Sequence, residues 1–286
     1  MNLPEDILDR AVETALSEDR AFDDITTSLL VPEDMTGVAR IFTREDGIIS
    51  GQECAERTFL RLDPDVAYRR RVSDGGAVRA GDVVAEISGR LAAVISAERT
   101  ALNFLGHLSG VATRTGLFAA KLEGTGIRVL DTRKTLPGLR ALEKKAVIDG
   151  GGENHRHDLG SYLLVKENHI AAAGGMEGLA ELLGAKMALA EVEVSSLDQL
   201  GLLAETPPAR VMLDNFGPAQ VAEAVGYIGR WKGSRPEIEV SGGIGLDNIE
   251  EYAIAGIDFI SVGSLTSSAR SLDLSMLAGG EEGGQR

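Results

Sequence analysis

The chain has 286 residues, of which 43% are hydrophobic and 26% are charged, as in an ordinary soluble globular protein. Its formal net charge of −15, with no run rich in Lys or Arg, argues against a nucleic-acid partner. No apolar stretch approaches the roughly 20 residues of a membrane helix, and a single cysteine, Cys54, excludes an intrachain disulfide. We therefore expect a cytoplasmic protein without membrane or nucleic-acid partners.

The first 110 residues predict an N-terminal α/β sandwich domain. The start, MNLPEDILDRAVETAL, has the spacing of an acidic amphipathic helix and lacks the layout of a secretion signal. Strand-like runs separated by turns follow as far as residue 93, and the Asp-Gly and Ala-Gly-Asp signals at 74–82 predict hairpins. DGGAVRAGD and VVAEISG resemble two neighbouring strands of a barrel-sandwich module.

Two helices are expected after this region. Ser96 is the predicted N-cap of the first, because leucines recur on one helical face behind it, at 102, 105 and 108. The second is expected to follow Gly110 and to run from Val111 to Leu122.

From residue 127 the pattern changes to alternating strands and helices. Six apolar runs have the length of buried parallel strands, at 127–131, 162–166, 189–194, 210–214, 237–241 and 258–262. Helices are expected at 137–149, 175–188, 196–204, 218–228 and 246–255. The predicted fold class is α/β: an α+β N-terminal sandwich (1–110), then an irregular, incomplete TIM-like α/β barrel (111–275). Residues 276–286 are expected to form a disordered tail.

Polar side chains and glycines follow the predicted strands where each one ends. They are Asp131, Lys166, Glu193, Asp214, Ser241 and Gly263. Parallel α/β barrels handle ligands at this face with residues from several strand ends. The sequence therefore predicts one site at the carboxyl edge of the sheet.

The segment 131–170 is a cationic island in an acidic chain. It holds seven Lys and Arg residues against six carboxylates, a formal charge of +1, so the rest of the chain carries −16. A cleft can focus positive potential and attract an anion even when the net charge opposes it. Arg133 and Lys134, with Arg156 and Lys166, suit a ligand with several anionic groups, although a solvated loop would also explain the first two.

A glycine triplet at 150–152 leads directly into Asn154, His155 and Arg156. Glycine lets the backbone approach a ligand closely, so we expect His155 to contact the ligand rather than to be an ordinary loop histidine. His157 and His169 remain open between a ligand contact and a structural hydrogen bond. Metal ligation by these three histidines is not expected, because cations surround them.

The later strand ends predict sites for a sugar, a metal and a phosphate. Glu193 and Asp214 are either ion-pair partners of nearby cations or acceptors for ribose hydroxyls and ligands of Mg²⁺ through water. Ser241–Gly243 and Gly263–Ser264 stand where barrels bind phosphate with backbone N–H groups, although tight turns alone would also place glycines there.

These motifs resemble those of the quinolinate phosphoribosyltransferase family. The resemblance runs over nearly the whole chain, from ALSEDRAFDDITT, TREDGIISG and ERTALNFLGHLSGVAT through to EVEVSS, MLDNF, EVSGGI and DFISVGSLT. Its most specific parts are DTRKT-x-PGLR, GGG-x-NHR and LLVKENHI. The resemblance implies a sandwich-plus-barrel fold in a homodimer whose active sites each borrow residues from the neighbouring subunit.

The activity that the resemblance implies is phosphoribosyl transfer to quinolinate. Quinolinate and 5-phosphoribosyl 1-diphosphate would give nicotinate mononucleotide, diphosphate and CO₂ with Mg²⁺, on the de novo route to NAD. The residues implied around the dicarboxylate and diphosphate are Arg99 (from the partner subunit), Thr132, Arg133, Lys134, His155, Arg156 and Lys166. Glu193 and Asp214 match the ribose and Mg²⁺ positions, and Ser241, Gly242, Gly243, Gly263 and Ser264 match the 5′-phosphate site. Lys134, Lys166, Glu193 and Asp214 are the expected catalytic residues.

The chain departs from the family pattern at three points, and other functions stay open. Ser267 stands where the family often has His, Asp158 in HRHDL adds a carboxylate beside the cations, and KENH replaces the usual KDNH. Pyrophosphorylase-like paralogues found with molybdate transport share DTRKT and the glycine triplet, although Asn154 and LLVKENH favour the quinolinate enzyme. A Schiff-base aldolase using Lys166 and a non-catalytic anion-binding protein are the remaining alternatives.

Overall fold

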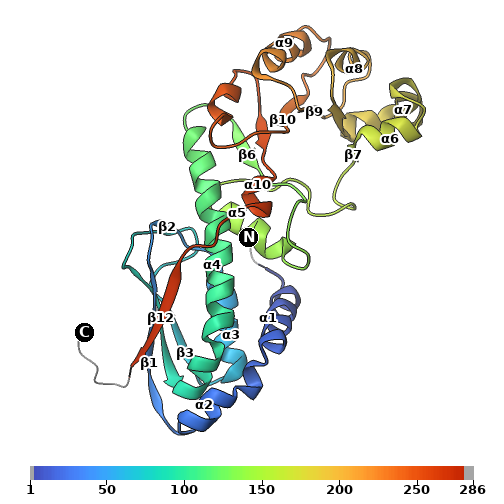
Figure 1. Cartoon of the computed structure of the whole chain (residues 1–286). Helices are drawn as coiled ribbons and strands as arrows, with labels where there is room; N and C mark the ends of the chain where they lie inside the picture. Colours follow the sequence, from blue (N-terminus) through green and yellow to red (C-terminus); the bar gives the residue numbers. More distant parts are fainter. Residues whose placement is uncertain (1–2, 280–286) are drawn as a thin grey trace. The chain divides into compact units, whose positions relative to one another are not determined.

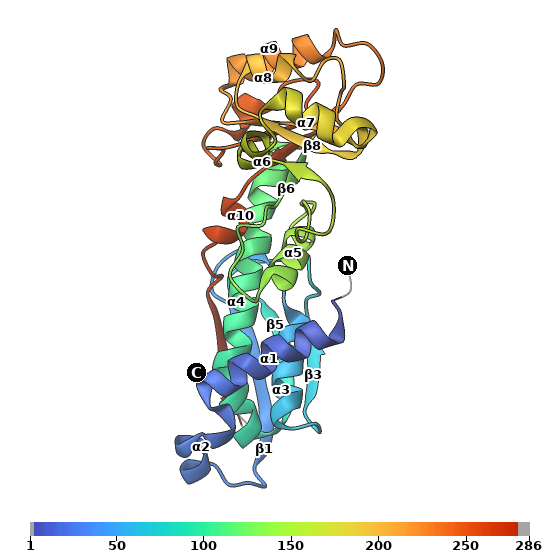
Figure 2. The same ribbon diagram turned by 90° about the vertical axis from the view of Figure 1, so that its right-hand side faces the viewer.

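The computed structural model describes residues 3–279, which divide into two compact units. Of these residues, the first unit contains 3–116, 135–151 and 265–279, and the second contains 117–134 and 152–264. Figures 1 and 2 show the elements of both units along the chain.

The first unit is built on a four-stranded antiparallel sheet in the order β12-β1-β5-β3. Its strands are β1 (Thr36–Thr43), β3 (Ala67–Arg70), β5 (Val83–Arg90) and β12 (Leu274–Gly279). Its helices are α1 (Glu5–Asp19), η1 (Ala21–Asp23), α2 (Ile25–Leu30), α3 (Gln52–Leu62) and α5 (Arg140–Asp149). Alternate residues of β1, such as Ala39 and Ile41, are fully buried and form one core with Phe59 of α3. Helices α1 and α3 lie side by side over this sheet (Figure 2).

The strands that flank 74–82, β3 and β5, pair antiparallel, but neither turn signal forms a hairpin with β4 (Ala77–Val78). Strand β4 pairs with β2 (Gly47–Ile48), while β5 pairs with β1 and β3. DGGAVRAGD and VVAEISG are therefore not neighbouring strands. The carboxylate of Asp74 accepts a hydrogen bond from the backbone N–H of Gln52 at 3.1 Å, and so ties this turn to α3.

Helix α4 (Leu91–Lys121) is one continuous helix of 31 residues where two were expected. Strand structure ends at Arg90, three residues before the predicted limit. Ser96 is an interior residue whose hydroxyl donates to the Asp24 carboxylate at 2.9 Å, and Asp24 is itself the N-cap of α2. Gly110 does not break the helix: a Cβ there would lie 2.1 Å from the carbonyl oxygen of Arg270, so glycine allows a close backbone approach.

Residues 276–279, which were expected in a disordered tail, form the end of β12. They pair antiparallel with β1, with Met276 opposite Ile41 and Gly279 opposite Val38, so β12 is an edge strand of the sheet (Figure 1). The remaining part of the expected tail, 280–286, lies outside the described residues.

Cys54 is buried in the first unit, with 1% of its surface exposed. Burial raises the pKa of this thiol to about 12. Because the thiolate is the reactive form, we expect no reaction with a thiol-directed reagent at pH 8 in the native protein. Complete reaction in 6 M guanidinium chloride is the control, and stoichiometric labelling of the native protein would contradict this prediction.

The second unit is a parallel sheet in the order β6-β11-β10-β9-β8-β7. The strands are β6 (Arg128–Leu130), β7 (Leu164–Val165), β8 (Glu191–Val194), β9 (Arg210–Asp214), β10 (Glu237–Ser241) and β11 (Phe259–Ser261). All six predicted strands are confirmed. The first strand, β6, pairs with the last, β11, and β7 forms the opposite edge, which gives the incomplete barrel that the sequence predicts.

Short helices follow these strands. They are α6 (Glu167–Ala172), α7 (Met176–Leu183), η2 (Gly184–Leu189), α8 (Leu197–Gly201), α9 (Pro218–Ile228) and η3 (Ile249–Tyr252), followed by α10 (Ser264–Ser267). Helix α9 has the predicted bounds, and Pro218 occupies its first turn, where a missing N–H costs nothing. The prediction of a helix at 246–255 is wrong, because only the four-residue 3-10 helix η3 forms there. Within residues 3–279 no helix has the length and apolar character needed to cross a membrane.

Candidate functional site

The second unit contains a cavity of about 290 Å³ at the carboxyl ends of its strands. Nine residues that the sequence predicts for the site line it together: Thr132, Arg133, Lys134, His155, Arg156, Lys166, Glu193, Asp214 and Ser241. Four further residues complete the wall: Leu164, Met212, Glu239 and Ser261. The convergence of strand ends that the sequence predicts is therefore present.

Sheet register explains why these residues converge. Ser241 lies opposite Asp214 on one neighbouring strand and opposite Ser261 on the other. Glu239, two residues before Ser241, shares its face of the sheet because side chains alternate along a strand. The cavity is thus built in layers, with Ser241 at the rim and Glu239 below it.

The other predicted site residues do not line this cavity. Arg99 is an exposed residue of α4 in the first unit. Gly242 has φ +94°, and a Cβ there would meet the Asn215 side chain at 2.2 Å, while Gly243 has φ +65° in open space. Gly263 lies against Lys134, whose Cδ would be 2.9 Å from an added Cβ. Ser264 is the first residue of α10.

Two arginines offer unused donors in the second unit. Arg156 is 7% exposed, and the Nε atoms of Arg156 and Arg133 are buried without a hydrogen-bond partner among residues 3–279. Buried polar groups are almost always hydrogen-bonded, and a guanidinium binds carboxylate and phosphate most strongly. Both side chains line the cavity, so an anionic ligand would supply the missing acceptors.

Carboxylates and lysines face each other on the same wall. The Nζ of Lys166 pairs with the carboxylate of Glu193, so the lysine is engaged rather than free to attack a carbonyl. Burial, together with the charge of Glu193, raises the pKa of Asp214, and Lys166 and Lys134 oppose this rise. The carboxylates of Glu193 and Asp214 therefore lie close to the two lysines on one wall of the cavity.

The buried carboxylate of Asp131 holds the segment after the glycine triplet. It accepts hydrogen bonds from the Asn154 side chain at 2.7 Å and from the His155 backbone N–H at 2.9 Å. Within the triplet, Gly151 adopts the expected positive φ, at +87°, and Gly150 serves helix packing. A Cβ on Gly150 would lie 2.3 Å from the carbonyl oxygen of Ala112, so this glycine allows α5 to pack closely on α4.

The two ring nitrogens of His155 contact the protein. Nδ1 accepts from the Arg156 backbone N–H at 2.9 Å, so the proton lies on Nε2, which is 3.2 Å from the Glu191 carboxylate. The Tyr162 hydroxyl donates to the other oxygen of Glu191 at 2.9 Å. Although burial acts to raise the pKa of Glu191, the hydrogen bond from His155 and the charge of Arg210 hold it below its usual value.

His155, Glu191 and Glu239 place potential metal-ligating atoms within 4.8 Å of one another. A guanidinium nitrogen of Arg210 lies 3.1 Å from Glu239 and 3.9 Å from Glu191. The guanidinium also stacks on the Phe259 ring at 4.0 Å. Since a protein cation already balances these carboxylates, the cluster is an ion-pair network beneath the cavity.

Glu239 should make stability depend on pH. Burial, with the charge of Glu191, raises its pKa to about 7 from 4.5. The folded state therefore keeps a proton that the unfolded state loses, so the free energy of unfolding should fall as the pH rises from about 4.5 to 7. Glu239→Gln should remove this loss and gain on the order of 2 kcal/mol relative to wild type at pH 8.

Denaturant titrations at pH 5 and pH 8 check this expectation. The half-exposed Glu237 lies on the same strand, so Glu237→Gln is the matched control. Its effect on the free energy of unfolding should differ less between pH 5 and pH 8 than the effect of Glu239→Gln. An equal effect of Glu239→Gln at pH 5 and pH 8 would contradict it.

His169 and two of the departures from the family pattern have local contacts. His169 Nδ1 accepts from the Lys166 backbone N–H at 3.0 Å, which is a structural hydrogen bond. Asp158 accepts from the Gly160 N–H and the Ser161 hydroxyl, and these contacts lower its pKa. Asp158 thus closes its own turn. Ser267 lies 3.4 Å from the hydroxyl of Ser268.

The acidic floor of the cavity was missed at the sequence level. Strands β8 and β10 read as continuous apolar runs, but each carries glutamates two residues apart, Glu191 with Glu193 and Glu237 with Glu239. This period-2 pairing places both carboxylates on one face. It is the signal that could have identified Glu191 and Glu239.

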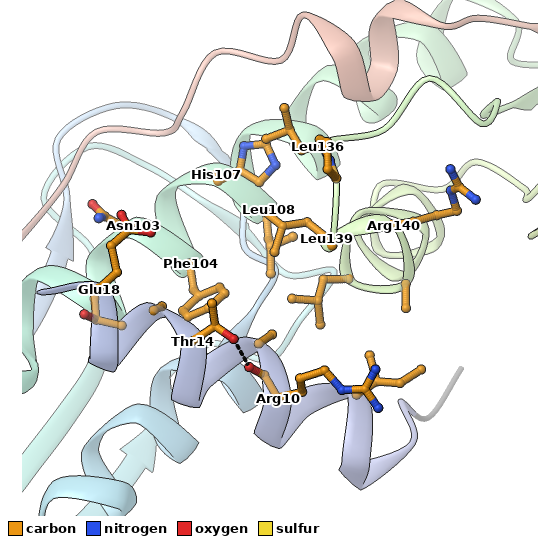
Figure 3. A pocket seen from close by; sticks show the side chains of 18 of the residues that line it. Arg10, Thr14, Glu18, Asn103, Phe104, His107, Leu108, Leu136, Leu139 and Arg140 are labelled. Carbon is orange, nitrogen blue, oxygen red and sulfur yellow. Dashed lines mark hydrogen bonds between the residues drawn. The ribbon is translucent and has the colours of Figure 1, made fainter.

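The first unit has a larger cavity of about 850 Å³ that the sequence does not predict. Figure 3 shows it between α1, which carries Arg10 and Thr14, and α4, which carries Phe104 and His107. Leu136 and Leu139 of the segment before α5 complete an apolar interior (Figure 3). His107 is held by a 2.8 Å contact with the fully buried Glu143. Arg99 lines a neighbouring cavity of about 510 Å³ together with His107 and Asp273.

Two family models match this chain in succession. Residues 24–109 match the N-terminal domain of quinolinate phosphoribosyl transferase, and residues 111–277 match its C-terminal domain. Together they span most of the sequence.

Curated relatives and solved structures agree with these models. The nicotinate-nucleotide pyrophosphorylase [carboxylating] of Mycobacterium leprae is 39% identical over 272 residues, covering 93% of this chain and 95% of its own. The structure of the nicotinate-nucleotide pyrophosphorylase from Francisella tularensis superposes with a TM-score of 0.87 at 37% identity, covering 97% and 98% of the two chains. NadC from Streptococcus pyogenes gives 0.89 at 36% identity, with the same coverage.

Proposed function

Because this chain belongs to the quinolinate phosphoribosyl transferase family, we propose that it makes nicotinate mononucleotide, diphosphate and CO₂ from quinolinate and 5-phosphoribosyl 1-diphosphate. This reaction lies on the de novo route to NAD. The observation that carries the proposal is the cavity of the second unit, where two arginines and two lysines from different βα connections converge. The unpartnered Nε atoms of Arg133 and Arg156 call for an acidic ligand.

Quinolinate fits this donor set because it carries two carboxylates on one planar ring. Guanidinium groups bind carboxylates through paired, charge-assisted hydrogen bonds. We assign Arg133 and Arg156 to the dicarboxylate, with Thr132, His155 and Lys166 beside it, and Lys134 to the diphosphate. The side chain of His155 contributes mainly by shaping this wall, since its two nitrogens contact Arg156 and Glu191.

The reaction explains why the site is rich in cations. The pyridine nitrogen is already an unprotonated nucleophile, so the transfer needs no residue to remove a proton. The nitrogen bonds to the anomeric carbon as the bond to diphosphate breaks, and fixed cations stabilise the departing charge. Loss of CO₂ then leaves an electron pair on the ring carbon next to the cationic nitrogen. This carbon binds a proton in place of the carboxylate.

Glu193 and Asp214 would hold Mg²⁺ beside the ribose and diphosphate. Carboxylate oxygens are the ligands that Mg²⁺ prefers, often through water. Burial, together with the nearby charge of Glu193, raises the pKa of Asp214. The bound ion would neutralise charge on the diphosphate. We assign the 5′-phosphate to the backbone of Ser241–Gly243 and Gly263–Ser264, where glycines keep side chains out of the way.

We further propose a cytoplasmic homodimer in which Arg99 of one subunit completes the site of the other. Arg99 is exposed in the first unit, beside polar residues that line a cavity. The apolar groove between α1 and α4 (Figure 3) offers a surface for subunit contact. A buried, unpaired Cys54 suits a reducing compartment.

Release of diphosphate tests the proposal. We expect release only when quinolinate, 5-phosphoribosyl 1-diphosphate and Mg²⁺ are all present, with CO₂ formed in equal amount. Absence of turnover with all three, in protein that binds quinolinate, would instead support a non-catalytic anion-binding protein. The engagement of Lys166 with Glu193 disfavours the Schiff-base alternative, and borohydride trapping with carbonyl compounds should give no adduct at Lys166.

A further inference from the structure

Glu191 has no part in the chemistry proposed above, yet its carboxylate is buried and contacts two specific side chains. It begins β8 and is 3% exposed. One oxygen lies 3.2 Å from His155 Nε2, and the other accepts from the Tyr162 hydroxyl at 2.9 Å. Burying a carboxylate costs free energy of desolvation, which its hydrogen-bond partners must offset. These partners therefore indicate the structural role of Glu191.

Apart from Arg210, the partners of Glu191 lie at the two ends of one loop. Residues 155–163, here called the Arg156 loop, run from the segment held by Asp131 to the start of β7. The backbone N–H of Glu191 also donates to the Leu163 carbonyl at 2.8 Å. One residue of β8 therefore contacts both the beginning and the end of the loop.

Arg156 depends on the same two residues for its own position. Its backbone N–H donates to His155 Nδ1 at 2.9 Å, and its guanidinium Nη1 donates to the Tyr162 carbonyl at 3.5 Å. Its Nε has no partner among the described residues, and its side chain lines the cavity. Guanidinium binding of a carboxylate is directional, so a small shift of this loop would misalign the donors.

We propose that Glu191 is a positioning residue that holds the His155 and Tyr162 side chains, which also contact each other, and thereby aims Arg156 into the cavity. This inference rests on the proposed function, because it takes Arg156 to bind the dicarboxylate. Its effect should appear in the affinity for quinolinate rather than in the rate of the bound complex. The hydrogen bonds of Glu191 carry this role, and its negative charge does not.

Three substitutions separate hydrogen bonding from charge. Glu191→Ala removes both contacts, whereas Glu191→Gln keeps an oxygen for the His155 Nε2–H and gains an N–H that can donate to the Tyr162 oxygen. Tyr162→Phe removes the hydroxyl's contacts with Glu191 and with the His155 ring, and leaves the contact between Glu191 and His155. We expect Glu191→Ala to raise the KM for quinolinate about tenfold, and Tyr162→Phe about threefold.

The rest of the kinetic pattern distinguishes positioning from general damage. In Glu191→Ala, kcat and the KM for 5-phosphoribosyl 1-diphosphate should change less than about twofold, as expected when ground-state binding alone is lost. Glu191→Gln should restore the KM for quinolinate to within about twofold of wild type. A Glu191→Gln variant as impaired as Glu191→Ala would overturn the inference, because charge would then be what matters.

Hydrogen exchange of the backbone amides tests the loop without relying on turnover. Amides of the Arg156 loop should exchange faster in Glu191→Ala and Tyr162→Phe than in wild type, and at the wild-type rate in Glu191→Gln. If wild type does not turn over quinolinate, the proposed function fails. Hydrogen exchange still tests whether Glu191 orders the Arg156 loop. Should Glu191→Ala not fold, Tyr162→Phe decides, and its unchanged exchange and unchanged KM would end the inference.

Discussion

Replacing Arg156 by Ala is expected to weaken quinolinate binding by about 10- to 150-fold, which corresponds to about 1.5–3 kcal/mol for a lost charge-assisted hydrogen bond. Arg156 is 7% exposed and lines the cavity with an unpartnered Nε. Its guanidinium therefore has few uses other than binding a ligand. Calorimetric titration of quinolinate into the two proteins measures the difference directly.

Two control variants make this experiment specific. Arg156→Lys keeps the charge but not the planar pair of donors, so it should recover part of the affinity. Arg235→Ala removes a half-exposed arginine of the same unit that pairs with Asp258 at 2.9 Å, and should leave quinolinate binding unchanged. Equal affinity in wild type and Arg156→Ala would remove Arg156 from the binding site.

Mixing inactive Arg99→Ala and Arg133→Ala proteins is expected to restore activity. If Arg99 acts across a dimer, each hybrid dimer contains one site with both arginines and one site with neither. Random exchange of subunits at equal concentrations should then return about a quarter of the wild-type specific activity. The measurement is turnover before and after exchange.

The outcome discriminates between a shared site and one formed within a single subunit. If both arginines came from the same subunit, every site in a hybrid dimer would lack one of them and no activity would return. Mixing Arg133→Ala with Arg156→Ala serves as the control, because both residues line the same cavity and their hybrids have no intact site. Absence of recovery after confirmed exchange would refute the sharing of Arg99.

The parallel sheet was predictable because buried strands leave a strong local signal. Runs such as RVMLD and EIEVS at 210–214 and 237–241 are short, apolar and bounded by turn residues, and both form strands with the predicted bounds. Helix α4 was not predictable in this way. Ser96 and Gly110 look like helix boundaries, but tertiary contacts with Asp24 and Arg270 explain their presence inside a continuous helix.

The cations of the site were predictable for a similar reason. Arg133, Lys134 and Lys166 follow strands and Arg156 precedes one, in a segment whose charge contrasts with the rest of the chain. The acidic layer below them was not, because Glu191 and Glu239 stand inside strands that read as apolar. Their burial is tolerated because Arg210 pairs with both carboxylates and His155 contacts Glu191. That compensation depends on residues distant in the sequence and becomes visible only in the fold.

We propose that cations from separate βα connections form a site for an acceptor with two carboxylates. A coupled assay for mononucleotide formation, run in parallel with quinolinate and with nicotinate at matched concentrations of 5-phosphoribosyl 1-diphosphate and Mg²⁺, tests it most directly. We expect product from quinolinate and none from nicotinate, because the single carboxylate leaves part of the arginine cluster unpaired. Equal turnover of the two acceptors, or turnover of nicotinate alone, would contradict the claim.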